Sequence, residues 1–213
     1  MAAASAAFGV ALEDDDFTRE SKSLARDRLI AAFDDGTPVG LTAAYEFDLT
    51  IPGGTLRAPG VTWVGVLPTH RRRGILRELM RRQLNDVHER GEPLAILWAS
   101  EAAIYGRFGY GLAAPSVGIE ADRARFGLRD DPGPRAIVRL LELETAFPVL
   151  RDVYERIRPG VPGMLSRNEH WWREHKLADP ERWRQGAGPK FYAVVELDGT
   201  AEAYAMYRVK EEW

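Results

Sequence analysis

The chain has 213 residues, of which 45% are hydrophobic and 29% charged, and it carries a net charge of −3 at pH 7. No apolar run approaches the ~20 residues of a membrane-spanning helix, the N-terminal stretch lacks the basic flank of a signal peptide, and the acidic balance argues against a general nucleic-acid binder. The absence of cysteine excludes disulfides, thiolate metal sites and a cysteine nucleophile, and it is typical of a cytoplasmic protein.

The first half of the chain predicts a sheet of short strands with one long amphipathic helix. Between residues 73 and 89, apolar side chains recur at helical spacing, with arginines on the other side. Gly91 and Pro93 end this helix. The remaining elements are separated by turn signals such as Asp34-Asp35-Gly36. In chain order we expect a helix over 5–28, strands over 29–33, 39–49 and 56–66, the helix over 73–89, a strand over 94–98, a short helical piece over 102–108 and a strand near 115–120.

A second unit is expected after the Pro/Gly-rich run at 130–134. Its predicted elements repeat the opening half of the first unit and then stop, without a second arginine–glycine helix start. They are a strand over 136–140, helices over 147–156 and 167–176, and a hairpin over 191–197 and 201–209. Strands that alternate with helices predict an α/β fold with a mixed sheet.

The segment 64–77 carries the strongest chemical signal in the sequence. A strand ends at Val66, Pro68 forces a turn, and a helix begins near Gly74. The first amides of a helix have no partner within the helix and lie at the positive end of its dipole. Gly74 allows a close approach to the backbone, and neighbouring arginines add charge-assisted hydrogen bonds. This combination predicts a site for a pyrophosphate.

Two motifs in this region resemble a known family. The spacing Arg71-x-x-Gly74-x-Leu76 is similar to the acetyl-CoA signature of the GCN5-related N-acetyltransferases (GNAT), in which the last position is usually small. The runs 68–77 and 100–111 together resemble the Eis (enhanced intracellular survival) branch, where leucine at that position is normal. The resemblance continues with lower specificity to Val209. It implies the GNAT acyl-CoA N-acyltransferase fold, with an acetyl-CoA-binding domain over 1–129 and a partial second GNAT-like domain over 130–213.

The resemblance also implies roles for individual residues. Backbone groups of one strand would pair with the pantetheine arm of acetyl-CoA and polarise the acetyl carbonyl, and these belong to Val64, Gly65 and Val66. Pyrophosphate and nucleotide would be held by Arg72, Arg73, Gly74, Ile75, Leu76 and Arg77. Ser100 and Glu101 would flank the pantetheine where two strands splay apart. Tyr105 matches the general acid that protonates the leaving thiolate, and no metal is implied.

The implied reaction is direct attack of a primary amine on the thioester of acetyl-CoA. An aminoglycoside-like polyamine or a lysine side chain is the expected acceptor, and a homo-oligomer is the expected assembly. In the resembling family the base is the carboxylate at the end of a sterol-carrier-like third domain. The present sequence ends inside the second domain and its first strand is not visible before Ala2, so we expect a truncated chain. The alternative function is therefore an acetyl-CoA-binding fragment without turnover.

Plainer interpretations stay open beside these. The arginines between Arg71 and Arg82 are also compatible with a solvated helix face, or with a patch for nucleic acid or an acidic protein. Tyr105 shares a predicted helix face with Phe108 and is compatible with core packing. The acidic run from Glu13 to Asp16 is either a solvated segment or part of a pocket for a cationic amine.

Overall fold

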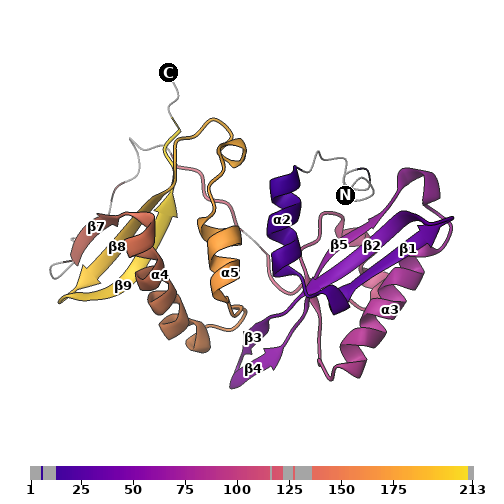
Figure 1. Cartoon of the computed structure of the whole chain (residues 1–213). Coiled ribbons are helices and arrows are strands. Elements are labelled where there is room, and N and C mark those ends of the chain that lie inside the picture. The colour runs from indigo at the N-terminus through magenta and orange to yellow at the C-terminus, as the bar shows by residue number, and fades with distance from the viewer. Residues whose placement is uncertain (1–5, 7–12, 116, 122–126, 128–135, 211–213) are drawn as a thin grey trace. The chain divides into compact units, whose positions relative to one another are not determined.

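The structure of the protein is a computed structural model that describes residues 6, 13–115, 117–121, 127 and 136–210 (Figure 1). The chain divides into two compact units. Unit 1 comprises Met1–Gly111 and Arg158–Trp171, and unit 2 comprises Leu112–Ile157 and Trp172–Trp213. The expected boundary between residues 129 and 130 lies outside the described residues. The expected assignment of 158–171 to the second domain differs from the contacts of that segment, which belong to unit 1.

Unit 1 is built on a four-stranded mixed sheet. The strands lie in the order β1 (Leu29–Asp34), β2 (Thr37–Tyr45), β5 (Gly60–Val66) and β6 (Ile96–Leu97). Antiparallel pairing joins β1 to β2 and β2 to β5, whereas β5 and β6 are parallel. The expected hairpin is thus confirmed, although the strand expected over 39–49 ends at Tyr45 and residues 48 and 49 belong to a separate strand. The expected strand over 94–98 is reduced to the two residues of β6.

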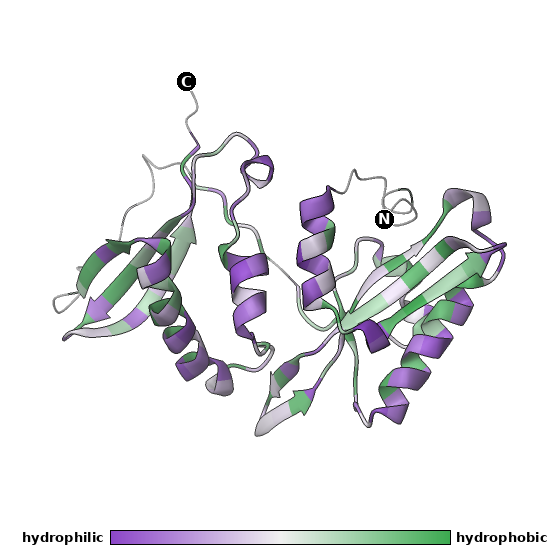
Figure 2. Ribbon diagram, in the orientation of Figure 1, coloured by the Kyte–Doolittle hydropathy of each residue, from purple (hydrophilic) through white to green (hydrophobic). Residues whose placement is uncertain are grey.

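Two helices cover opposite faces of this sheet (Figure 1). On one face, α3 (Ile75–Glu89) buries Leu79 and Met80, and its Gln83 side chain donates to the Ala43 carbonyl at 3.0 Å. On the other face, α2 (Asp14–Ser23) reaches Tyr45 of β2. Because successive side chains of a strand point to opposite faces, Tyr45 lies on the face of β2 opposite to the side chains that contact α3. Figure 2 shows α2 as mostly hydrophilic, whereas β1, β2 and β5 are mostly white to green.

The segment Arg158–Trp171 adds a strand-like edge to unit 1. A small hairpin, β3 (Asp48–Ile51) and β4 (Gly54–Arg57), leaves the sheet after β2. Leu165 pairs with Leu49 of β3 in an isolated antiparallel bridge, and Met164 accepts a hydrogen bond at 2.9 Å from the amide of Thr50. These backbone bonds explain why a segment from far along the sequence belongs to the first unit.

Unit 2 is a three-stranded antiparallel sheet with one long helix. The strands are β7 (Ala136–Leu141), β8 (Phe191–Leu197) and β9 (Thr200–Tyr207), in that order. Helix α4 (Leu143–Ile157) buries Phe147, Leu150 and Val153. Trp172 is completely buried, and its ring packs edge-on against Tyr154 at a centroid distance of 5.4 Å. This arrangement confirms the strand–helix–hairpin order that the sequence predicts.

Several expected elements differ from the structure. The strand expected near 115–120 is absent, because residue 115 and residues 117–121 carry no strand. The helix expected over 167–176 is a short helix α5 (Glu169–Trp171) that continues as a π-helix over Trp172–Leu177. The strand expected over 56–66 is divided into β4 and β5. Among the helices that the structure describes, none has the length and apolar composition needed to cross a bilayer.

A buried ion pair joins the 3₁₀ turn Arg26–Arg28, just before β1, to the segment after α3. Arg28 and Glu92 are 3% and 7% exposed, and the guanidinium donates two hydrogen bonds to the Glu92 carboxylate, at 3.0 and 2.5 Å. Arg28 also donates from Nε to Glu46 at 3.0 Å. These carboxylates, Glu92 foremost, raise the pKa of Arg28 despite its burial. Two fork-like bonds to a buried carboxylate are the strong form of an ion pair.

We predict that Glu92→Ala lowers the free energy of unfolding by about 3–5 kcal/mol, because it leaves a buried guanidinium without its main partner. Urea unfolding followed by circular dichroism measures this loss. The control is Glu46→Ala, which removes a carboxylate that is 61% exposed and costs no more than about 1 kcal/mol. Equal losses in the two variants would contradict the prediction.

Candidate functional site

The cleft of unit 1 begins where β5 and β6 separate. The two strands pair only at Gly60 with Ile96 and at Val61 with Leu97. Past this point β5 continues to Val66, and the described residues place no strand beside it on that side. The Leu67 amide donates to the Val39 carbonyl at 2.9 Å, so Leu67 faces β2. By the two-residue alternation of an antiparallel pair, the backbone groups of Val66 face away from β2, into the gap.

A β-bulge on β5 sets the direction of this edge. Ala43 pairs with Thr62 and Leu41 pairs with Gly65, so two residues of β5, Trp63 and Val64, stand opposite one residue of β2. Trp63 has a φ of 56°, a left-handed conformation that is uncommon for a non-glycine residue. A bulge bends its strand and increases the local twist. The bulge therefore bends β5 directly after the two positions at which it pairs with β6.

A cavity of about 650 Å³ occupies this gap. It contains three residues that the sequence singled out, namely Val64 on one wall and Ser100 and Tyr105 on the other. Gly60 is required at its inner end, because a Cβ on this residue would lie 2.6 Å from the Phe47 ring. The full lining consists of Tyr45, Phe47, Gly60, Val61, Thr62, Trp63, Val64, Ile96, Leu97, Trp98, Ser100, Tyr105, Leu165 and Trp171.

The loop between β5 and α3 forms a cradle of backbone amides. Arg72 and Gly74 both have positive φ angles, of 62° and 82°, and Gly74 is the N-cap of α3 without a side-chain cap. Turns of this kind expose successive N–H groups and favour anions. The amides at the start of α3, those of Ile75, Leu76 and Arg77, have no intrahelical partner. The turn and the helix start that the sequence predicts are therefore present, with the helix beginning one residue after Gly74, and the anion site at this turn stays a prediction.

The arginines around this loop separate into paired and unpaired groups. Arg81 and Arg82 donate to Glu78, and these two bonds lower the pKa of Glu78 to about 2. Arg73 lies 3.7 Å from Asp34, which also bonds His70 at 3.0 Å. The exposed side chains of Arg71, Arg72 and Arg77 have no ion-pair partner in the part of the chain that the structure describes. Uncompensated positive charge is thus concentrated at the cradle rather than along the whole helix.

Tyr105 lies between two short 3₁₀ turns and is half-buried. Its carbonyl accepts hydrogen bonds from the amides of Phe108 and Tyr110, at 2.9 and 3.3 Å, which fix the loop around it. Burial and then the charge of Glu101 raise the pKa of the Tyr105 phenol above its ordinary value. A raised pKa keeps the hydroxyl protonated at neutral pH, as an acid requires. The alternative of simple core packing is weakened, because Tyr105 borders the cavity.

Tyr110 is the close neighbour of Tyr105. The two rings meet edge-to-face at a centroid distance of 5.9 Å. Burial, followed by the effect of Tyr105, raises the pKa of Tyr110 to about 12. The Tyr110 hydroxyl is buried and has no hydrogen-bond partner within the described residues. It remains neutral and supports the ring of Tyr105.

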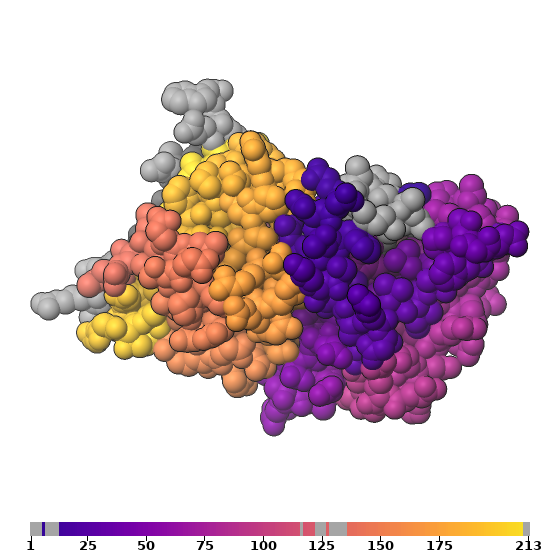
Figure 3. All heavy atoms as spheres, viewed as in Figure 1, coloured from indigo at the N-terminus to yellow at the C-terminus, as the bar shows by residue number. Residues whose placement is uncertain are grey.

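A carboxylate on α2 holds two aromatic residues of the cavity, and sequence reasoning missed it. Glu20 accepts hydrogen bonds from the Tyr45 hydroxyl and, at 3.3 Å, from the indole N–H of Trp63. Burial and then the charge of Glu20 raise the pKa of Tyr45. Glu20 lies in a helix of low hydropathy that stands at the surface of unit 1 (Figure 3), and no local pattern distinguishes it from its exposed neighbours.

The segment after Arg158 contributes two further residues that the sequence did not indicate. Leu165 and Trp171 line the cavity, and the Trp171 ring packs edge-on against Phe47 at 4.8 Å. Their contribution depends on the backbone pairing of this segment with β3, which links positions far apart in the sequence. A pattern within a single segment carries no signal for such a contact.

The acidic run from Glu13 to Asp16 has a structural explanation. Glu13 is the N-cap of α2 and forms a capping box with Asp16, and Asp14 and Asp15 lie in the first turn. Carboxylates at a helix N-terminus satisfy free amides and interact favourably with the helix dipole. None of the four lines the cavity. In residues 13–115, 117–121, 127 and 136–210, no group of three or more histidine or acidic side chains is arranged to hold a metal ion.

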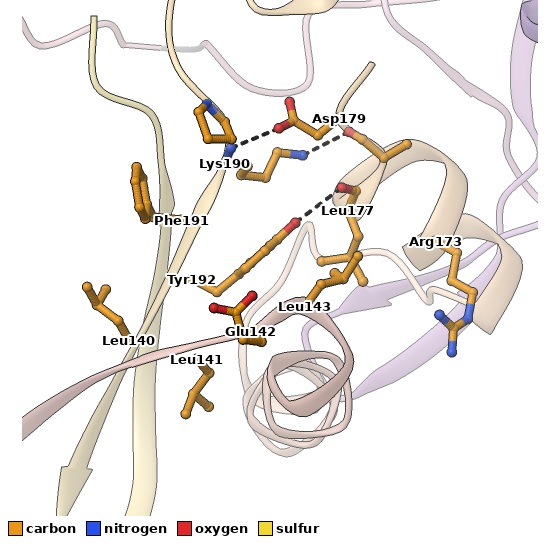
Figure 4. A pocket seen from close by; sticks show the side chains of 12 residues that line it. Leu140, Leu141, Glu142, Leu143, Arg173, Leu177, Asp179, Lys190, Phe191 and Tyr192 are labelled. Atoms are coloured by element: carbon orange, nitrogen blue, oxygen red, sulfur yellow. Dashed lines mark hydrogen bonds between the residues drawn. The ribbon is translucent and has the colours of Figure 1, made fainter. Parts of the chain in front are cut away.

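Unit 2 contains a separate cavity of about 590 Å³ between the ends of β7 and β8 and the π-helix (Figure 4). Its main polar groups are already engaged. The Lys190 ammonium donates to the carbonyls of Lys176 and Ala178 at 2.6 and 3.0 Å, and burial lowers its pKa. Asp179 accepts from Arg208 at 2.7 Å and from the Lys190 amide at 2.8 Å. These bonds join loop segments to the sheet, and we assign them a structural role.

Comparison with known families agrees with this geometry. Residues 1–113 match a family model described as an acetyltransferase (GNAT) domain, and residues 163–213 match a second model with the same description. The first match covers 113 of 213 residues, more than half of the chain. The protein therefore belongs to the GNAT acetyltransferase family, with one near-complete domain followed by part of a second.

Individual relatives point to the Eis branch. The chain is 44% identical over 189 residues to an uncharacterized N-acetyltransferase of Streptomyces avermitilis, covering 88% of this chain and 46% of the relative. It is 38% identical over 177 residues to N-acetyltransferase Eis of Mycobacterium tuberculosis, covering 80% and 42%. The solved structure of Eis1 from Mycobacterium abscessus is 32% identical with a TM-score of 0.69, covering 97% of this chain and 49% of that one. The chain thus spans about half the length of the relatives it matches.

A probable N-acyltransferase from Enterococcus faecalis supports the fold alone. It is 18% identical with a TM-score of 0.75, and the alignment covers 98% of this chain and 51% of that chain. The same arrangement of strands and helices is therefore compatible with very different sequences.

We predict that Glu20→Gln lowers the pKa of Tyr45 toward its ordinary value, because a neutral amide no longer opposes the phenolate charge. Burial still keeps this pKa above the value of a free tyrosine. Because the pKa is raised in the folded state, the contribution of Tyr45 to stability is complete below about pH 10 and is lost as the pH rises through the folded-state pKa.

Ultraviolet titration of tyrosinate, compared with the same titration in Tyr45→Phe, isolates this residue. The control is Asp15→Asn, which removes one exposed charge from the same helix and leaves the Tyr45 titration unchanged. An unchanged Tyr45 titration in Glu20→Gln would refute the assignment.

Proposed function

We propose that this chain carries the acetyl-CoA-binding and acetyl-transferring domain of an N-acetyltransferase that acts on primary amines, with Tyr105 as its general acid. The observation that carries the proposal is the meeting of two features in one cavity. The backbone edge of β5, which has no neighbouring strand, forms one wall, and a half-buried tyrosine with a raised pKa borders the other.

The fit of acetyl-CoA follows from the backbone. An extended pantetheine arm contains two amides, and the edge of β5 offers the donors and acceptors that such amides need at Val66, while Val64 and Gly65 precede it on the strand and Gly65 pairs with Leu41 of β2. Ser100 lines the facing wall, with Glu101 beside it. The cradle formed by Arg72, Arg73, Gly74, Ile75, Leu76 and Arg77 suits the pyrophosphate and nucleotide, because the first amides of α3 are free and Arg72 and Arg77 have no ion-pair partner within the described residues.

The proposed reaction has a simple balance. Acetyl-CoA supplies the acetyl group as an activated thioester. The neutral amine attacks the carbonyl carbon, a C–N bond forms and the C–S bond breaks. The amine loses one proton, and Tyr105 gives its phenolic proton to the departing sulfur and is reprotonated afterwards. The products are an N-acetylated amine and free coenzyme A, and orientation in the cavity provides much of the rate gain.

The proposal also includes the acetyl acceptor and the oligomeric state. Resemblance to the Eis branch suggests an aminoglycoside-like polyamine or a lysine side chain, within a cytoplasmic homo-oligomer. The alternative is an acetyl-CoA-binding module without turnover. One observation favours it, because none of the fourteen lining residues is a carboxylate or a histidine that would serve as a base. Acetylation assays with the chain alone separate the two functions.

We predict that Gly74→Ala weakens acetyl-CoA binding about tenfold, measured by calorimetric titration. A Cβ at this position meets no atom within 4 Å, so its effect arises from the φ of 82°, which alanine adopts only with strain. Gly91→Ala is the matched control, since Gly91 has a φ of 68°, also has open space and follows the other end of α3. Equal losses of acetyl-CoA affinity in the two variants would show that the cradle is not part of the acetyl-CoA site.

We predict that Tyr105→Phe lowers kcat by about 10²–10⁴ and changes the Kd of acetyl-CoA by no more than about twofold, because the variant removes a proton donor but keeps the ring. In the unmodified protein, activity declines as Tyr105 deprotonates. Its raised pKa places that decline above about pH 10. Initial rates against pH test both statements, and a parallel loss of binding and turnover would indicate a structural tyrosine.

A further inference from the structure

The residue at the bulge of β5 has a strained backbone. Trp63 has a φ of 56°, and a positive φ is a genuine outlier for so bulky a side chain. It lies directly before the part of β5 that ends at Val66. A residue keeps such a conformation only where its surroundings determine it more strongly than its own preference does. The contacts of the Trp63 side chain therefore influence the course of the strand edge that follows.

One of these contacts is a hydrogen bond to a carboxylate on another element. The indole N–H of Trp63 donates to Oε2 of Glu20 at 3.3 Å, although the two residues are 43 positions apart in the sequence. An indole has one donor and no acceptor, and an ionised acceptor forms the stronger kind of hydrogen bond. The bond therefore links the bulge to helix α2 and fixes the direction of the indole.

The carboxylate of Glu20 is itself held by β2. The same Oε2 accepts a hydrogen bond from the Tyr45 hydroxyl. The Tyr45 ring packs edge-on against Trp171 at 4.9 Å, and Tyr45 pairs with Gly60 at the start of β5. Glu20 thus bridges two neighbouring strands, through Tyr45 on β2 and Trp63 on β5. A bridge of this kind opposes a rotation of Trp63 out of its left-handed conformation.

Helix α2 depends on polar contacts for its place on the sheet. It has no fully buried side chain. Its contacts include the two hydrogen bonds of Glu20 and a distance of 3.4 Å between the Arg19 carbonyl and Nε2 of His170. An element with few buried apolar contacts belongs to the less stable part of a fold. Stabilising the Trp63 conformation therefore also stabilises α2.

From these observations we propose that Glu20 is a positioning residue of the acetyl-CoA site. It acts through Trp63, because its carboxylate holds the bulge in the conformation in which the edge of β5 receives the pantetheine arm. The inference rests on the proposed function and adds to that site a residue that does not line the cavity. Since linkage is reciprocal, binding of acetyl-CoA to this edge also stabilises α2.

Calorimetric titration with acetyl-CoA tests the positioning role. We expect Glu20→Ala to weaken binding about tenfold, as the loss of one hydrogen bond to a charged group does. Glu20→Gln keeps an acceptor oxygen, and we expect it to weaken binding by no more than about threefold. Asp15→Ala removes an exposed carboxylate from the same helix and is the matched control, with unchanged affinity. Unchanged affinity in Glu20→Ala, or an equal loss in the control, would overturn the proposal.

A double-mutant cycle tests whether Glu20 acts through Trp63. Trp63→Phe keeps an aromatic ring and removes the indole N–H. We expect this variant to bind acetyl-CoA about tenfold more weakly, and we expect no further loss when Glu20→Ala is added, because both changes break the same hydrogen bond. Two independent losses would multiply to about a hundredfold, and that result would refute the path through Trp63.

Two further measurements separate positioning from a general loss of folded structure. In nuclear magnetic resonance spectra, the amide signals of Val64, Gly65 and Val66 shift in Glu20→Ala, together with the indole N–H signal that Trp63→Phe identifies. In hydrogen exchange followed by mass spectrometry, the amides of Asp14–Ser23 exchange more slowly when acetyl-CoA is added to the native chain, and this slowing is lost in Trp63→Phe. Unshifted amide signals, or exchange in the native chain that acetyl-CoA does not slow, would contradict the proposal.

These results also distinguish the inference from the proposed function. If the native chain and Glu20→Ala bind acetyl-CoA equally well, the inference alone fails. If the native chain binds no acetyl-CoA, the proposed function fails, and the amide signals of Val64, Gly65 and Val66 still decide whether Glu20 positions this edge.

Discussion

The separation of β5 from β6 is the constraint on which the site depends. The strands share only two paired positions, and a bulge at Trp63 follows directly on β5. Backbone groups along the freed edge need partners, and an extended ligand with amides of its own is well suited to supply them. The same separation opens the cavity that Tyr105 borders. A continuous β5–β6 ladder would close that cavity and satisfy the edge.

The charged side chains of this protein serve different structural roles, which depend on their partners in the fold. The acidic run at Glu13–Asp16 caps α2, and Glu78 binds two of the arginines on α3. Arg28 is buried with Glu92. Arg71, Arg72 and Arg77, which have no ion-pair partner within the described residues, lie in or next to the α3 cradle, and this agrees with an anion site more closely than with an extended patch for nucleic acid.

Residues from two distant parts of the chain form the aromatic lining of the unit 1 cavity. Tyr45 is the last residue of β2 and Phe47 follows that strand, whereas Trp171 comes from the segment that pairs with β3. The second GNAT match begins at residue 163, inside this segment. The chain therefore uses the beginning of its second domain to complete the first, and the boundaries of sequence families and of compact units differ for this reason.

The sequence by itself determined the helix after Gly74, the hairpins and the GNAT class, because each depends on local periodicity, turn chemistry or a contiguous motif. It did not predict the bulge at Trp63, the role of Glu20 or the contribution of Trp171, and it wrongly predicted a strand near 115–120. A bulge is a mismatch in register between two strands, and Glu20 and Trp171 act through contacts with residues far away in the sequence. Only the tertiary structure decided these features, because hydrogen bonding and ring packing between distant segments leave no periodic signal within either one.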